Sequence, residues 1–165
     1  MPASSADLFA FLDRLGISHN TTHHSAAFTV DQARSLRGQI PGGHTKNLFL
    51  KDKKGSLFLV VALEHAPIDL KALQHTLGAA RFSFGSAELL RQVLGVEPGA
   101  VTPFAAMNDT DRKVTIILDA AMMEHAVLNY HPLDNTMTTS IGREDLLKFL
   151  DATGHRAQVV PVSQG

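Results

Sequence analysis

The 165-residue chain contains no cysteine, which excludes disulfides, thiolate catalysis and zinc held by cysteine. No apolar run approaches the roughly 20 residues that a helix needs to cross a bilayer. The N-terminus lacks a basic segment followed by an apolar core, so we expect no secretory signal. These absences fit a reducing compartment, and we expect a cytoplasmic protein that does not bind membranes.

The chain also has little net charge, −1 at neutral pH, but its charges are unevenly distributed. Between Arg34 and Lys54 six positive residues meet one negative residue, a local charge of +5. A compact basic face on a near-neutral protein suits a small polyanion, such as one end of an RNA, better than long tracking along duplex DNA. A lysine-rich surface that only keeps the protein in solution is the alternative.

Nine histidines invite a metal hypothesis, but their spacing does not support one. No pair has the i, i+4 spacing with an intervening glutamate that is typical of zinc enzymes. Glu64–His65 and Glu124–His125 are adjacent pairs, whose side chains diverge. Ser86 is not in a nucleophile elbow, because Glu88 occupies the place of the second glycine. We therefore expect no metal site and no bound cofactor.

The length predicts one domain, residues 1–165, of mixed α/β class. Several strands follow one another without a helix between them, which indicates a curved mixed sheet or partial barrel with helices packed outside. Ser5, Asp69 and Ser86 are candidate helix N-caps, and Gly16, Gly78 and Gly95 are the matching stops. We expect helices at 5–15, 29–38, 69–77, 86–94 and 143–153, and strands at 47–51, 56–63, 80–84, 114–118, 126–130, 137–141 and 159–162.

The central stretch is 42–55, which begins as a glycine-rich loop, becomes a short strand and ends in a charged turn at 52–55. Lys46 and Asn47 lie at the mouth of this strand, directly after flexible glycines. A lysine and an amide in that position are well placed to bind an anionic group. A solvated hairpin end is the alternative.

Two further stretches are unusually specific for loops. The first is Gly-Ala-Val-Thr-Pro at 99–103, followed by apolar residues to 106. The second is Asn-Tyr-His-Pro-Leu-Asp-Asn-Thr at 129–136. With Lys46 and Asn47 they offer a cation, a backbone able to present N–H groups, a histidine and small polar side chains.

These three stretches, in this order and spacing, resemble the aminoacyl-tRNA editing domain that is inserted in bacterial prolyl-tRNA synthetases and also occurs as free-standing YbaK-type deacylases. The resemblance covers essentially the whole chain. The segments PGAVTPFAAMND and NYHPLDNTMTTSI are most similar to the free-standing branch that hydrolyses alanyl-tRNA(Pro). Related branches remove cysteine, serine or threonine with the same scaffold.

The resemblance implies the YbaK-type fold and hydrolysis of the ester that joins a wrong amino acid to the tRNA 3′ end. It implies that Lys46 holds the phosphate of the terminal adenosine, with Asn47 beside it. It also implies that Gly99 lies in a loop contacting the aminoacyl group, that His131 lines the pocket, and that the substrate's ribose hydroxyl helps to orient or activate the water.

The residues are chemically able to do this work. An aminoacyl ester is already activated, so placing a water and stabilising the oxyanion can suffice. Backbone N–H groups at Gly99 and its neighbours can stabilise the oxyanion. His131 is interpreted as a positioning residue, with a general-base role left open. The candidate catalytic residues are Lys46, Gly99 and His131.

A tight second pocket could exclude proline and admit alanine, since each methylene contributes only about 1–3 kcal/mol to discrimination in a synthetase site. Ordinary core packing is the alternative for its walls, above all for Phe104 and Met107. The candidate substrate-binding residues are Asn47, Ala100, Val101, Thr102, Pro103, Phe104, Met107 and Asn135, with Ala105 and Ala106 as further wall residues.

We expect the partner to be the acceptor stem of tRNA(Pro) carrying alanine, with prolyl-tRNA synthetase as a further partner and the protein itself as a monomer. A non-catalytic tRNA-binding module is the alternative function. Each basic residue could equally be a solvated surface charge. The candidate contacts to the tRNA body are Arg37, Lys51, Lys53, Lys54 and Arg81.

Overall fold

The computed structural model describes residues 2–24 and 40–163. The predicted helix at 29–38 and the candidate tRNA contact Arg37 lie outside these residues. The remaining helices follow the predicted caps closely. They are α1 (Ser5–Arg14), α3 (Leu70–Leu77), α4 (Ala87–Leu94) and α5 (Arg143–Ala152), with 3₁₀ helices η1 (Pro98–Ala100), η2 (Pro103–Asn108) and η3 (Met122–Glu124).

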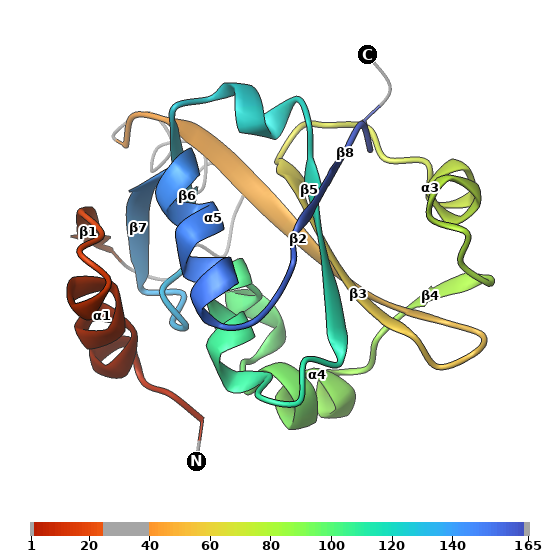
Figure 1. Ribbon diagram of the computed structural model, residues 1–165, viewed down its shortest axis with the longest axis horizontal. Helices are drawn as coiled ribbons and strands as arrows, with labels where there is room; N and C mark the ends of the chain where they lie inside the picture. The colour runs from red at the N-terminus through yellow and green to blue at the C-terminus, as the bar shows by residue number, and fades with distance from the viewer. Residues whose placement is uncertain (1, 25–39, 164–165) are drawn as a thin grey trace.

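The fold is mixed α/β, as predicted, and is built on one mixed sheet (Figure 1). The strand order is β1-β7-β6-β2-β3-β5-β8, and β4 pairs with β2 outside this path. Three pairings are parallel, namely β2 with β6, β3 with β5, and β5 with β8. The strands are β1 (His19–His23), β2 (Gly43–Asp52), β3 (Leu57–Leu63), β4 (Phe82–Phe84), β5 (Val114–Asp119), β6 (Val127–Tyr130), β7 (Met137–Gly142) and β8 (Gln158–Val160).

Helices cover both faces of the sheet, which explains why β3 is apolar along its whole length. On one face α1, α4, α5 and η2 enclose the larger core, which includes Phe49, Val61 and Phe104. On the other face α3 packs on a smaller core around Leu50 and Val60. Figure 1 shows α1 and α5 beside β1, β6 and β7, with α3 at the opposite end of the sheet.

Two details of the sequence prediction were wrong. Helix α1 is capped by Ser4, not Ser5, because the Ser4 hydroxyl accepts from the Asp7 N–H and the Asp7 carboxylate accepts from the Ser4 N–H. Strand β2 already begins at Gly43. Lys46 and Asn47 are therefore inside the strand rather than at its mouth.

Within residues 2–24 and 40–163, every helix is too short or too polar to traverse a bilayer. This finding bears on the described helices alone.

Candidate active site

The candidate site is built around an interruption along one edge of β2. Strand β3 occupies the other edge of β2 from Thr45 to Lys51. On the interrupted edge β6 pairs only with Gly43 and His44, and β4 pairs only from Leu50 onward. Between them, no described strand pairs with this edge, although backbone N–H and C=O groups there need partners. We call this stretch, residues 45–49, the open edge of β2.

The backbone of Asn47 points toward the open edge. The carbonyl of Phe49 accepts from the N–H of Gly85, which directly follows β4, at 2.9 Å, so it faces this edge. The carbonyl of His44 accepts from the N–H of Glu64 at 3.0 Å and faces the β3 edge. Because successive residues of a strand direct their peptide groups to alternate edges, the N–H and C=O of Asn47 face the same way as those of Phe49.

Lys46 is half-buried on the opposite face of the sheet from Asn47. Its Nζ donates to the carbonyl of Ala66, in the β3–α3 connection, at 2.6 Å. Among the described residues no carboxylate forms an ion pair with Lys46. The Lys46 Nζ therefore has a neutral partner, and no described carboxylate competes with an anionic ligand for it.

His131 directly follows β6, which runs parallel to β2. The register pairs His44 with Asn129, so Lys46 and His131 each lie two residues beyond the same pair. The Nδ1 of His131 lies 2.8 Å from the carbonyl of Met137 and must donate to it. This bond fixes the tautomer of the neutral ring, and Nε2 is left as an acceptor.

The surroundings of His131 favour that neutral ring. Burial lowers the pKa of His131, and the nearby His24 lowers it further. The bond to Met137 and the charge of Asp134 oppose this shift without reversing it. The His24 ring centroid lies 6.3 Å from that of His131. The His24 Nε2 lies 2.8 Å from the hydroxyl of Thr138.

The Gly99 loop meets the β6–β7 connection through Asn135. A Cβ at position 99 would lie 3.1 Å from the Nδ2 of Asn135, tighter than most real contacts, so glycine is what permits this approach. The Ala100 N–H already donates to the Glu97 carbonyl at 2.9 Å, which removes it from the candidate oxyanion donors. The structure thus places Gly99 beside Asn135, which belongs to the same β6–β7 connection as His131.

Most of the other predicted wall residues are buried, and Val101 is partly buried. Phe104 is fully buried and makes edge contacts with Tyr130 and Phe149, so it is a core residue. The Thr102 hydroxyl caps η2 by accepting from the Phe104 N–H. Val101 is partly buried against the larger core. Pro103, Ala105 and Ala106 are buried in η2, and Ala100 is buried in η1.

Met107 lies away from this group. It lines a separate hollow of about 560 Å³ between the N-terminal segment and α4, together with Pro2, Val93 and Asn108. The position of Met107 therefore gives no support to its predicted place in the wall of the site.

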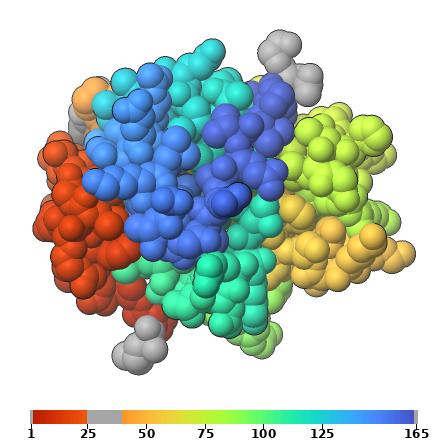
Figure 2. All heavy atoms as spheres, in the orientation of Figure 1, coloured from red at the N-terminus to blue at the C-terminus, as the bar shows by residue number. Residues whose placement is uncertain are grey.

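The predicted tRNA contacts among the described residues gather at the far end of β2. Lys51 pairs in register with Ser83, Arg81 directly precedes β4, and Lys53 and Lys54 form the β2–β3 turn. All four side chains are exposed. Figure 2 shows this hairpin projecting from the side of the molecule opposite α1. At about 3.3 Å per residue, Lys53 lies roughly 20 Å along the chain from Lys46.

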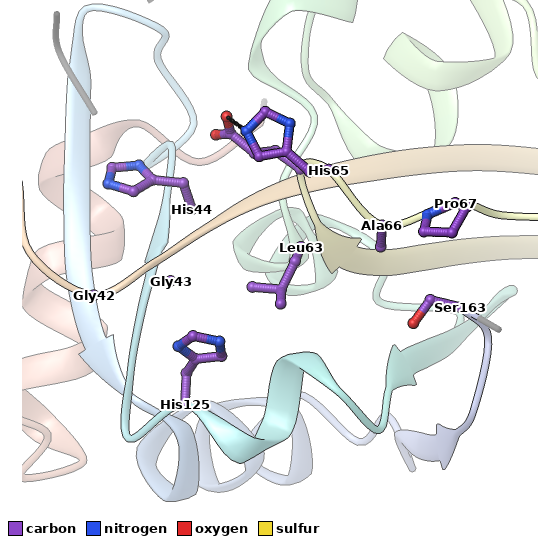
Figure 3. Close-up of a pocket in the computed structure, with 10 residues that line it drawn as sticks. Gly42, Gly43, His44, Leu63, His65, Ala66, Pro67, His125 and Ser163 are labelled. Carbon is purple, nitrogen blue, oxygen red and sulfur yellow. Dashed lines mark ion pairs between the residues drawn. The ribbon is translucent and has the colours of Figure 1, made fainter. Parts of the chain in front are cut away.

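A separate hollow of about 550 Å³ lies at the start of β2 (Figure 3). Its rim includes three histidines, but no group of three or more metal-ligating side chains occurs in the described parts of the chain. The prediction that the adjacent side chains of Glu64 and His65 diverge is wrong, because the His65 Nε2 lies 3.3 Å from the Glu64 carboxylate. The hollow adjoins the site through Ala66, whose carbonyl holds Lys46. It is lined by Gly42, Gly43, His44, Leu63, Glu64, His65, Ala66, Pro67, His125 and Ser163.

Three features of this site could not be predicted from residue type and local motifs. The open edge depends on where β4 and β6 stop pairing with β2, which no local motif encodes. The Ala66 carbonyl is a backbone group, so residue type does not reveal it. Asn129 belongs to the 129–136 motif, but the motif does not predict that its amide organises the start of β2 by donating to the carbonyls of Pro41 and Gly43.

Comparison with known proteins identifies the family of the chain. Residues 24–149 match the family model described as the aminoacyl-tRNA editing domain. The match covers well over half of the chain, so the chain belongs to the aminoacyl-tRNA editing domain family. The predicted family and enzyme class are confirmed, and the protein is an aminoacyl-tRNA deacylase.

Individual relatives extend over nearly the whole chain. "Prolyl-tRNA synthetase associated domain-containing protein 1" of Danio rerio is 39% identical over 151 residues, covering 90% of this chain and 82% of the relative. "Prolyl-tRNA editing protein ProX" of Acetoanaerobium sticklandii is 33% identical over 154 residues, covering 93% and 94%. A solved structure provisionally described as a trans-editing enzyme for prolyl tRNA synthetase shares the fold, with a TM-score of 0.73, 18% identity and full coverage of both chains.

Proposed function

We propose that this deacylase removes alanine from mischarged tRNA(Pro). The observation that carries the proposal is Lys46, a half-buried cation at the open edge whose hydrogen-bond partner among the described residues is the neutral carbonyl of Ala66. Lys46 lies on β2 two residues beyond the last pair with β6, the strand that leads to His131. The names of the relatives, which refer to prolyl-tRNA editing and to prolyl-tRNA synthetase, support tRNA(Pro) as the substrate and the synthetase as a further partner.

In this proposal Lys46 leaves the Ala66 carbonyl and binds the phosphate of the terminal adenosine. A charged acceptor replaces a neutral one, which strengthens the bond. The anchored 3′ end then places the aminoacyl ester at the Gly99 loop. The N–H groups of Gly99 and Val101 are the candidate donors to the oxyanion.

The reaction itself needs only water. Its oxygen attacks the ester carbonyl carbon, the bond to the ribose oxygen breaks, and the products are alanine and a tRNA with a free 3′-terminal ribose. The Nε2 of His131 can hold the attacking water, because the bond from Nδ1 to Met137 makes Nε2 an acceptor. The ribose hydroxyl of the substrate assists in orienting or activating this water.

Alanine selectivity is assigned to the walls beside the Gly99 loop, above all to Val101. Removing two methyl groups there should admit bulkier aminoacyl groups, because a methylene in an apolar pocket changes discrimination by about 1–3 kcal/mol. Val101→Ala should therefore broaden the substrate profile, whereas Met107→Ala, in the hollow beside α4, serves as its matched control. An unchanged profile in Val101→Ala excludes Val101 as the sieve.

The basic side chains at the hairpin are assigned to tRNA backbone contacts, and Arg37 is proposed alongside them. Exposed lysines and arginines bind phosphates with strong dependence on salt. The separation between hairpin and Lys46 along β2 suits an RNA that spans both, with its stem at the hairpin and its 3′ end at the open edge.

The deciding experiment measures deacylation of alanyl-, cysteinyl- and seryl-tRNA(Pro) by the purified protein, with Lys46→Ala as the control. Rapid loss of alanine alone, abolished in the variant, supports the proposal. Preference for cysteine or serine would reassign the substrate. Binding without turnover would instead indicate a non-catalytic tRNA-binding module.

A further inference from the structure

Asn47 carries the one side-chain oxygen or nitrogen in the described residues that is fully buried and has no hydrogen-bond partner, its Oδ1. Leaving a buried acceptor unpaired destabilises a fold, so such atoms are rare in native proteins. A group that the fold leaves unpaired next to a candidate site points to a ligand that completes it.

The position of Asn47 defines which part of a substrate could reach it. Its side chain lies on the face of β2 that also carries Phe49, and it pairs in register with Val61; both belong to the larger core. Val101, from the Gly99 loop, packs against the same core. Asn47 is therefore on the loop side of the sheet, whereas Lys46 is on the other side.

The unpaired oxygen is specific to Asn47, because its polar neighbours on the same edge are satisfied. The Thr45 hydroxyl donates to the carbonyl of Asn129 at 2.6 Å. The amide of Asn129 donates to Pro41 and Gly43, and its Oδ1 accepts from Ser140. Among the buried side-chain acceptors of residues 2–24 and 40–163, the Oδ1 of Asn47 alone lacks a donor, and it lies where the ladder is interrupted.

We propose that the Oδ1 of Asn47 accepts a hydrogen bond from the α-ammonium group of the aminoacyl ester. This inference rests on the proposed deacylase function and adds a recognition element to it. With the phosphate on the Lys46 side, the aminoacyl part of the substrate reaches the loop side, and the ammonium is the donor that every free aminoacyl ester carries. Such an acceptor discriminates against esters whose nitrogen is acylated, including peptidyl-tRNA.

The test compares alanyl-tRNA(Pro) with lactyl-tRNA(Pro), in which a hydroxyl replaces the ammonium. Hydrogen bonds to charged groups are stronger than neutral ones, so the wild type should prefer the alanyl ester by about ten- to a hundredfold in kcat/KM. Asn47→Ala should reduce this preference toward unity by lowering the alanyl rate more than the lactyl rate. Asn47→Asp, which keeps an acceptor and adds charge, should retain the preference.

Three results would overturn the inference. Equal losses on both esters in Asn47→Ala would assign Asn47 to the ribose or to the fold, and an unchanged preference would remove it from recognition. Loss of activity on both esters in Asn47→Asp would indicate that the site receives an anion. If the wild type failed to hydrolyse alanyl-tRNA(Pro), the proposed function would fail, a result distinct from the other three.

Discussion

Asn47 and Asn129 lie near the same edge of β2, but they differ in hydrogen bonding. The amide of Asn129 makes three hydrogen bonds, at 3.0 and 3.2 Å to the Pro41 and Gly43 carbonyls and at 2.5 Å from the Ser140 hydroxyl. The Oδ1 of Asn47 is buried and makes none with the described residues. One asparagine therefore holds the fold together, whereas the other is available to a ligand. Residue type alone does not distinguish these two roles.

The largest expected effect on catalysis comes from replacing Lys46, the residue before Asn47 at the open edge. Lys46→Ala should lower kcat/KM for alanyl-tRNA(Pro) by about ten- to a hundredfold, because hydrogen bonds to charged groups contribute about 1.5–3 kcal/mol. The free energy of unfolding should change little, since Lys46 loses a single bond to one half-buried loop carbonyl. Single-turnover deacylation and urea denaturation measure the two quantities, and a large loss of stability would show that Lys46 is mainly structural.

The two asparagines should also differ in how much each contributes to stability. Asn129→Ala leaves two carbonyls and a hydroxyl without a partner and should lower the free energy of unfolding by about 1–3 kcal/mol. Asn47→Ala removes an unsatisfied group and should leave it within about 0.5 kcal/mol of the wild type. Urea denaturation of both variants checks this contrast, which would be broken if the two lost equal stability.

A third prediction concerns pH and His131. Burial and the neighbouring His24 lower its pKa, so the neutral ring persists below the ordinary value of about 6.5. If catalysis needs neutral Nε2, kcat/KM should stay level through pH 6.5 and fall about tenfold per unit below the lowered pKa. A pH–rate profile against His131→Asn checks this, and an acid limb centred above 6.5 would contradict it.

The same shift has a consequence for stability. Between the lowered pKa in the folded state and about 6.5 in the unfolded state, the unfolded chain binds more protons. The contribution of His131 is thus fully present above about pH 6.5 and is lost as the pH falls toward the lowered value. Denaturation curves across this range should show the decline in the wild type and a smaller one in His131→Asn.

The smallest expected effect is at the hairpin, far from both asparagines. Lys53→Ala with Lys54→Ala should weaken tRNA binding severalfold at low salt. Each lost phosphate contact should reduce the slope of log K against log salt by roughly one. A salt titration of binding measures this, and Lys148→Ala on α5 is a matched control. Binding that is independent of salt in the wild type would exclude the basic face.

Most of the elements of this fold could be predicted from local signals. The alternation in β2, the apolar run of β3 and the caps Asp69 and Ser86 each reflect contacts within a few residues, so the chain encodes them locally. The first cap was misplaced by one residue, because Ser4 and Ser5 are chemically equivalent and only the bond to Asp7 separates them. The role of the wall residues could not be predicted, because a phenylalanine in the core and a phenylalanine that lines a pocket are the same residue type. Only the structure shows that Phe104 is in the core.

By itself the sequence determined the family, the mixed α/β class and the set of residues that are chemically able to bind an anion, because these depend on residue type, order and spacing. Tertiary structure alone decided which polar groups are satisfied. Whether an amide has partners depends on where distant strands begin and stop pairing, as β6 and β4 do on either side of Asn47. The difference between Asn129 and Asn47 is a property of the assembled sheet, and no segment of the chain carries it.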